Sequence, residues 1–408
     1  MKISIKVGII VLAVLLLALP LVAASGCGKK TPSTVVDIVF GSINDLTGPA
    51  SPATKPVQYA LEDVAKYVNE NDPIPGVNIK VVAYDCQYNP ARDVLGWDFL
   101  RGQGAKVIYS PIPTTISTLA SFAARDKVPL VIATGSRDTL EPPGWVFSWY
   151  PAADQIIKGQ MEWLAKQWKG TGKIKIGSAG WDEPYATEIK KGASAYAQAH
   201  PDKFQWVGGY LAPFLTMTWS AEIGALKSCD YIIAPTTIPG TTTFMKQARE
   251  SGFKGKFVST DAIAGFTSFI VDAVGWADLD GMTASHVTTY WSTESPLTDL
   301  ATELVRKYHP GEADGIISAG CGYSSVVPYA LMYFEILRKA VDKVGVENFT
   351  GQAYYDVANN FKSKSIDGYK EAVFTPTSRS AYMYHRVYEW SASAQDLVSR
   401  SDWIPIPE

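Results

Sequence analysis

Residues 106–138 have the sequence KVIYSPIPTTISTLASFAARDKVPLVIATGSRD, in which the pattern of a parallel α/β sheet is clearest. They read as a strand (106–110), a helix (114–124) and a second strand (128–134). Both strands are short apolar runs, the pattern of strands that are buried on both faces of a parallel sheet. Each run is followed by small hydroxyl residues, which are Ser110, Thr114, Thr115, Thr134 and Ser136.

These hydroxyl residues mark the expected edge of a binding site. In an open α/β sheet, ligands bind outside the carboxyl ends of the strands. Thr114 and Thr115 would also lie at a helix start, where free backbone N–H groups and the helix dipole favour an anion. The stretch therefore predicts a hydroxyl-lined anion site rather than a catalytic centre. Capping of a helix by the same residues is an equally good interpretation.

The alternation of strand and helix continues along the chain. Apolar runs predict further strands at residues 35–43, 78–85, 145–149, 173–177, 204–210, 230–235 and 256–260. Strands that alternate with helices in this way form parallel sheets covered on both faces. The pattern breaks near residues 149–151, which predicts two lobes. Residues 382–390 read as a late strand that rejoins the second lobe, so that several crossings would form a hinge.

Composition and motifs argue against several functions. The 408 residues carry a net charge of −3, which gives no basic face for nucleic acid. Four cysteines and four histidines are scattered without metal-ligand spacing, so no metal site is expected. The sequence has no dinucleotide fingerprint, phosphate-binding loop or Gly-x-Ser-x-Gly motif, and Cys321 has no histidine in a supporting motif. We therefore expect neither an enzyme nor a cofactor.

The first residues predict the location of the protein. A basic start at residues 1–6 precedes an apolar run at 7–22 and small residues up to Cys27. This is the pattern of a secretory signal peptide, and its last four residues, ASGC, resemble a bacterial lipobox in which Cys27 is lipidated. An ordinary signal peptide cut nearby is the alternative. Residues 28–35 predict a polar tether, so we expect a lipid-anchored protein outside the cytoplasm.

A ring of strand tips is the strongest candidate binding site. Its members are Thr114, Thr115 and Ser136 from the first half of the chain, and Tyr185, Thr237 and Asp261 from the second. Hydroxyls that face a lone carboxylate suit a ligand with one anionic and one cationic end. For Asp261, a helix N-cap is an equally good interpretation.

The order of several motifs resembles a known family over residues 36–390. The motifs are residues 41–48 (GSINDLTG), 84–85 (YD), 89–91 (NPA), 127–134 (KVPLVIAT) and 244–252 (FMKQARESG). Together they resemble the solute-binding proteins of ABC importers in the branched-chain amino-acid class. The resemblance implies the type I periplasmic-binding fold, an α/β fold of two doubly wound parallel-sheet lobes joined by a multi-strand hinge. Lobe 1 is then expected at residues 36–149 plus 286–375, and lobe 2 at 150–285 plus 376–408.

The resemblance also implies which residues hold a ligand. The expected carboxylate contacts are Pro113, Thr114, Thr115, Ser136 and Arg137, and the expected second-lobe contacts are Tyr185, Thr237 and Asp261. Asp261 would receive an amino group. The sequence departs from the family's pattern at residues 111–113, where serines are common, and at Asp261, where glutamate is common. Arg137 is an unexpected charge, and Ile112 replaces a cysteine that some members pair with the Cys86 position.

By this resemblance the chain is a receptor that captures a small amino acid-like or carboxylate solute between two closing lobes. A ligand that touches both lobes stabilises the closed state. The partners implied are the solute and an ABC permease in the membrane, and a monomer is expected. The departures leave aromatic acids and short amides as alternative solutes. A ligand-sensing receptor with the same fold is a further alternative, and an extracytoplasmic amidase lacks a recognisable nucleophile and base.

Overall fold

The computed structural model describes residues 35–363 and 370–407. The predicted signal peptide, Cys27 and residues 28–34 of the predicted tether lie outside this described part. The described residues from Val36 onwards form one compact unit by their contacts.

The first sheet consists of five parallel strands in the order β2-β1-β3-β4-β5. Their bounds are Val36–Asn44 (β1), Val77–Asp85 (β2), Val107–Ser110 (β3), Leu130–Ile132 (β4) and Val146–Ser148 (β5). β1 pairs with β2 along its whole length, from Val36 opposite Val77 to Asn44 opposite Asp85. Every residue of β3, β4 and β5 is buried, as the continuous apolar runs predict for strands covered on both faces.

The second sheet has the order β12-β11-β10-β9-β8-β6-β7, with β13 paired to β11. Its strands are Ile174–Trp181 (β6), Phe204–Ala212 (β7), Tyr231–Ile233 (β8), Lys256–Thr260 (β9), Thr283–His286 (β10), Tyr384–Ser391 (β11), Asp396–Ser399 (β12) and Ile404–Pro405 (β13). The strands from β7 to β10 are parallel. β11 and β12 extend this sheet in antiparallel pairing. A short turn joins β11 to β12, because antiparallel neighbours need no helical crossover, whereas four helices and a 3-10 helix of the described part separate β10 from β11 along the chain.

Helices cover both faces of the first sheet. One face carries α1 (Ser51–Asn71), α12 (Pro296–Tyr308), α14 (Val326–Val344) and α15 (Gly351–Ala358), and the other carries α2 (Pro90–Gly102) and α3 (Pro113–Asp126). Successive residues of β3 alternate between the two cores: Val107 and Tyr109 belong to one, and Ile108 to the other. This period of two lets a fully apolar strand serve both layers of helices. The short elements α4 (Arg137–Leu140), α13 (Ala313–Ala319) and the 3-10 helix Val346–Asn348 complete this half.

The second sheet is covered in the same way. One face carries α5 (Ala153–Gln167) and α6 (Pro184–Ala199), and the other carries α7 (Ser220–Leu226), α8 (Gly240–Glu250) and α10 (Thr267–Val274). The short helices α9 (Asp261–Ala264) and α11 (Trp276–Leu279) follow β9 and precede β10. Each sheet therefore has its own pair of apolar cores, which is the architecture expected of two α/β lobes.

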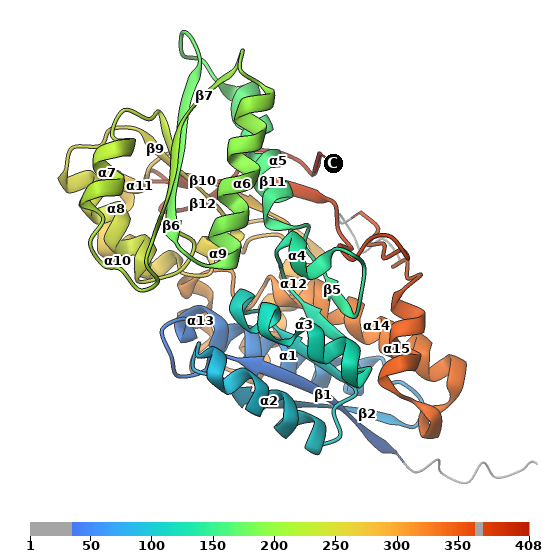
Figure 1. Ribbon diagram of the computed structural model, residues 1–408. Helices are drawn as coiled ribbons and strands as arrows, with labels where there is room; N and C mark the ends of the chain where they lie inside the picture. The colour runs from blue at the N-terminus through green and yellow to red at the C-terminus, as the bar shows by residue number, and fades with distance from the viewer. Residues whose placement is uncertain (1–34, 364–369, 408) are drawn as a thin grey trace, which may run out of the picture. The chain divides into compact units, whose positions relative to one another are not determined.

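The chain passes between the two sheets more than once. It leaves the first sheet after β5, returns after β10, and rejoins the second sheet at β11. In Figure 1 the orange helices α12 and α14 consequently lie against the blue helix α1, although they are far apart in sequence. Residues 379–382 hydrogen-bond to the end of β5, with Ser148 N donating to Arg379 O at 2.8 Å and Ala381 N donating to Ser148 O at 2.8 Å. Two of the crossing segments therefore lie side by side.

The predicted fold class of two parallel-sheet α/β lobes with crossing strands is confirmed. The lobe ranges inferred from the sequence stay a prediction. The antiparallel strand β12 and the short helices α9, α11, α13 and α15 were not predicted. These helices span one or two turns each, too few residues to produce a clear period of 3.6 in the sequence.

Two further findings concern the described residues alone. None of their helices combines the length and the apolar character that crossing a membrane would require. Cys86, Cys229 and Cys321 are buried and form no disulfide with one another.

Candidate functional site

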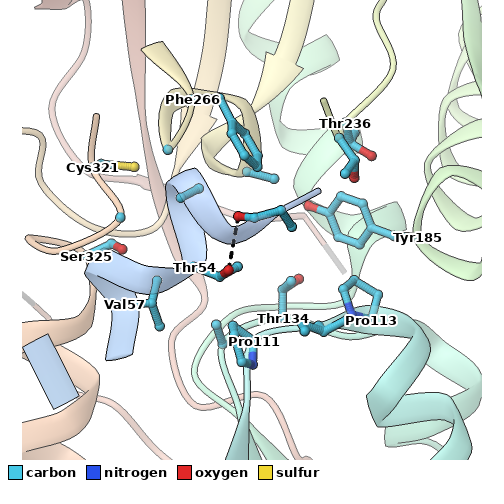
Figure 2. A pocket seen from close by; sticks show the side chains of 18 of the residues that line it. Thr54, Val57, Pro111, Pro113, Thr134, Tyr185, Thr236, Phe266, Cys321 and Ser325 are labelled. Atoms are coloured by element: carbon cyan, nitrogen blue, oxygen red, sulfur yellow. Dashed lines mark hydrogen bonds between the residues drawn. The ribbon is translucent and has the colours of Figure 1, made fainter. Parts of the chain in front are cut away.

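The candidate site is a cleft of about 850 Å³, part of it open to solvent, at the strand tips of both sheets. From the first half of the chain it is lined by Ala50, Ala53, Thr54, Val57, Tyr88, Pro111, Ile112, Pro113, Ala133, Thr134 and Tyr150; from the rest by Glu183, Tyr185, Thr236, Thr237, Ala262, Gly265, Phe266, Cys321, Gly322, Ser325 and Tyr329. Figure 2 shows the labelled side chains arranged around a common space, with Thr134 from the first half facing Tyr185 and Thr236 from the second. The lining is mostly apolar with a few hydroxyl groups, which is typical of small-molecule sites.

Two strand tips of the first sheet contribute directly to the cleft. Pro113, in the first turn of α3, follows β3, and Thr134 follows β4. Thr134 is only 8% exposed, and its hydroxyl oxygen is buried without a hydrogen-bond partner among the described residues. Figure 2 shows this hydroxyl directed towards the cleft. A buried polar group left unpaired costs free energy, so the hydroxyl is available for a ligand.

The loop before α1 is held in place by a buried carboxylate. Asp45 accepts hydrogen bonds from the backbone N–H groups of Gly48 and Ala50, and burial raises the pKa of this carboxyl. Gly48 is required there, because a Cβ atom would lie 2.6 Å from the Asp45 carboxylate oxygen and 2.8 Å from the backbone of Gln87. This tight turn positions Ala50 and Thr54 at the cleft wall.

Glu183 brings a carboxylate into the cleft from the second sheet. It precedes Pro184 at the start of α6 and caps that helix, accepting hydrogen bonds from Tyr185 N (2.9 Å) and Ala186 N (2.6 Å). The pKa of Glu183 is raised to about 7, mainly by burial and to a smaller extent by the charge of Asp182, although the two backbone hydrogen bonds lower it. The group thus lies close to half ionised near neutral pH.

Tyr88 connects the two halves of the site. Gln87 and Tyr88 both adopt left-handed backbone conformations, with φ of +55° and +52°. This turn after β2 carries the Tyr88 ring onto Phe214 of the second half, with ring centroids 6.1 Å apart and planes within 11° of parallel. Burial is the main cause of the raised pKa of Tyr88, and the neighbouring Thr237 side chain lowers that pKa in part. Non-glycine residues rarely hold such φ values unless their surroundings enforce them.

The structure brings three of the eight predicted ligand residues to the cleft wall, namely Pro113, Tyr185 and Thr237. The Tyr185 hydroxyl lies 3.1 Å from that of Thr260. Asp261 begins α9 immediately after β9, and its side chain lies outside the described part of the structure. The remaining four do not line the cleft.

The other four predicted residues have structural surroundings of their own. Thr115 is buried and donates a hydrogen bond to Asp93 at 2.9 Å. The Thr114 hydroxyl is buried without a partner among the described residues, but away from the cleft lining. Ser136 lines a neighbouring hollow. Arg137 bonds to Glu141 and Asp154, each at 2.8 Å, so its charge is already neutralised.

Sequence reasoning missed Glu183 and Tyr88 as cleft residues, and it named Thr134 at the expected edge of the site without including it among the ligand residues. The position of Thr134 after an apolar strand could have identified it as a cleft residue. Ser136, two residues later, is also a hydroxyl residue after the same strand, so this pattern does not separate the two. Glu183 stands before a proline at a helix start, a recognisable N-cap pattern. No local signal predicts Tyr88, because its direction depends on two consecutive residues in the left-handed region.

A family model described as "Periplasmic binding protein" matches residues 37–395. The chain belongs to this family. Membership of a family of binding proteins confirms the prediction that the chain is not an enzyme. A comparison with curated protein sequences finds no significant match.

Several solved structures are similar to this chain. A branched-chain amino acid ABC transporter protein from Thermus thermophilus with bound valine has a TM-score of 0.75 and 18% identity, covering 91% of this chain and 97% of that chain. A fatty acid ABC transporter substrate-binding protein from Thermomonospora curvata has a TM-score of 0.73, 16% identity and coverages of 91% and 94%. A solute-binding protein from Rhodopseudomonas palustris with p-hydroxybenzoic acid has a TM-score of 0.73, 15% identity and coverages of 91% and 98%. At these identities the likeness confirms the fold and leaves the ligand open.

Glu183 predicts a measurable pH dependence of stability. Because its pKa is raised in the folded chain, the unfolded chain loses this proton first as the pH rises, and folding becomes less favourable between pH 4.5 and about 7. The substitution Glu183→Gln removes this effect. We expect the unfolding free energy of the variant, relative to the unsubstituted chain, to increase by about 2–3 kcal/mol from pH 4.5 to pH 8. Urea unfolding at several pH values measures the difference, and a pH-independent difference would contradict the assigned shift.

Thr134 and Thr115 allow a paired test of the cleft boundary. For a solute that stabilises the chain, Thr134→Val should weaken binding by about 0.5–1.5 kcal/mol, because one hydrogen bond is lost. Its unfolding free energy should not fall, since the hydroxyl has no partner among the described residues. Thr115→Val should instead lower the unfolding free energy by about 1–3 kcal/mol, because Asp93 loses its partner, and leave affinity unchanged. Titration calorimetry measures the affinity of each variant, and urea unfolding measures its stability. An equal loss of affinity in both variants would contradict the assignment of Thr134, and not Thr115, to the cleft wall.

Proposed function

We propose that this chain is the extracytoplasmic solute receptor of an ABC importer, and that it captures a small amino acid-like or carboxylate solute in the cleft. The observation that carries the proposal is that strand tips of both sheets line one cleft, with Pro113 and Thr134 on one side and Glu183, Tyr185 and Thr237 on the other. A solute that contacts both sides favours the arrangement in which the tips face each other. Such closure is a signal that a membrane permease can recognise.

Family membership supports the binding role, and the titles of similar structures support the link to ABC transport. Those titles name valine, fatty acids and p-hydroxybenzoic acid as ligands or cargo of other proteins. Aromatic acids and short amides therefore stay alternative solutes, and signalling to a sensor partner stays an alternative to transport. The proposed location, anchored to a membrane by lipid at Cys27, is supported by the sequence of residues 1–27.

A thermal-shift screen tests the receptor role. The sample is the chain without residues 1–27, unfolded and refolded to remove any bound solute. The panel contains free amino acids, aliphatic and aromatic carboxylates, and short amides. A solute at 100 times its dissociation constant should add about 2.7 kcal/mol to the unfolding free energy, so a true ligand should stand clear of the others.

The same screen on the variant Asp261→Ala tests its predicted role. If Asp261 receives an ammonium group, the variant should bind an ammonium-bearing solute more weakly by about 1.5–3 kcal/mol, the range for a hydrogen bond to a charged group. Unchanged affinity would remove Asp261 from the site. A folded chain that responds to no member of the panel would count against this solute class and favour the sensor alternative.

A further inference from the structure

The charge of the cleft lining points to a solute class, on the assumption that the proposed receptor function holds. Among the described side chains that line the cleft there is no lysine, arginine or histidine, and the carboxylate is Glu183. Its carboxyl group accepts hydrogen bonds from two backbone N–H groups, and no positively charged residue is among the groups that influence its pKa. A positively charged group in the cleft would supply that missing partner.

A second hollow next to the cleft is also lined by negatively charged side chains. It has a volume of about 630 Å³ and is lined by Ser136, Asp138, Asp182, Glu183, Pro184, Thr187, Glu188 and Lys191. Glu183 lines both hollows. This lining contains four carboxylates and one amino group. The amino group is that of Lys191, whose Nζ atom lies 4.0 Å from a carboxylate oxygen of Glu188. Side chains of one charge sign around an opening raise the local concentration of ligands of the opposite sign.

The positively charged side chain that was predicted to contact the ligand, Arg137, is not available to an anionic solute. Arg137 bonds to Glu141 and to Asp154, and Lys158 bonds to the same oxygen of Asp154 at 2.8 Å. Neither residue lines the cleft or the second hollow. A solute whose only charge is negative would therefore enter a cleft without a cationic side chain, beside Glu183.

The rest of the lining suits the body of an apolar amine. Tyr88, Tyr185, Phe266 and Tyr329 provide aromatic faces, which bind apolar groups and attract cations. The unpartnered Thr134 hydroxyl is nine-tenths buried and directed into the cleft, and a hydroxyl oxygen accepts a hydrogen bond from an ammonium group.

We propose that the recognised feature of the solute is a positive charge, and that the cleft binds organic amines with an apolar body even when they carry no carboxylate. In this arrangement the ammonium group donates to Glu183, and the aromatic side chains enclose the apolar part. A carboxylate, where present, is an accessory group.

Matched sets of compounds test this proposal by titration calorimetry on the chain without residues 1–27. One set is isoamylamine, isovaleramide and isovalerate, and a second is 3-phenylpropylamine, hydrocinnamamide and hydrocinnamate. In at least one set the amine should bind about 10- to 100-fold more tightly than the carboxylate of the same shape, the ratio that one charge-assisted hydrogen bond provides. A carboxylate that binds while its matched amine does not would overturn the proposal and leave the receptor function intact. Absence of binding by both amines would also overturn it.

The variant Glu183→Gln tests the assigned contact. Glutamine keeps an oxygen that can cap α6 but removes the charge, so affinity for the amine should fall by about 10- to 100-fold. Affinity for the neutral amide should change by less than about threefold. The matched control is Glu222→Gln on α7, which lines neither hollow and should leave both affinities unchanged. An equal loss for amine and amide would assign Glu183 a purely structural role and contradict the proposal.

Discussion

Parallel pairing of strands is the constraint on which the site depends. Each parallel strand must be followed by a helical crossover before the next begins, so all β-to-α turns of one sheet lie at the same edge. In this chain both sheets obey that rule over their central strands. The turns after β3 and β4 and those after β6 and β8 contribute Pro113, Thr134, Glu183 and Thr237 to one cleft. A site that is discontinuous in sequence is therefore assembled by the topology itself.

Buried carboxylates then shape the cleft locally, and they do so by capping backbone N–H groups. Asp45 holds the turn before α1, and Glu183 holds the start of α6. In both positions the carboxylate accepts hydrogen bonds from backbone N–H groups that have no partner within the helix or turn. The two differ in their surroundings, because Glu183 also lines the cleft while Asp45 is fully buried. A capping requirement of one helix thus gives the cleft its negative charge.

Contacts across the cleft depend on a strained turn and on the crossing segments. The left-handed pair Gln87 and Tyr88 places an aromatic ring of the first half against Phe214 and Thr237 of the second. Residues 379–382 add hydrogen bonds to β5 where the chain crosses between the sheets. Two of the apolar cores lie within one sheet and its helices. A third core, on the second sheet, also includes Ala50 and Ala53 from the first half of the chain, so apolar packing links the two halves as well.

The alternating α/β architecture and the two sheets could be predicted from the sequence, because buried parallel strands and amphipathic helices have distinct periods that are visible in a single chain. Ligand binding at the strand tips stays a prediction. Of the residues predicted to bind the ligand, Pro113, Tyr185 and Thr237 line the cleft. Only the tertiary structure decided that Thr134 rather than Thr115 faces the cleft, and that Arg137 is neutralised by Glu141 and Asp154. Neighbouring hydroxyls at a strand tip look equivalent in sequence, and their direction is set by packing against residues that are distant along the chain.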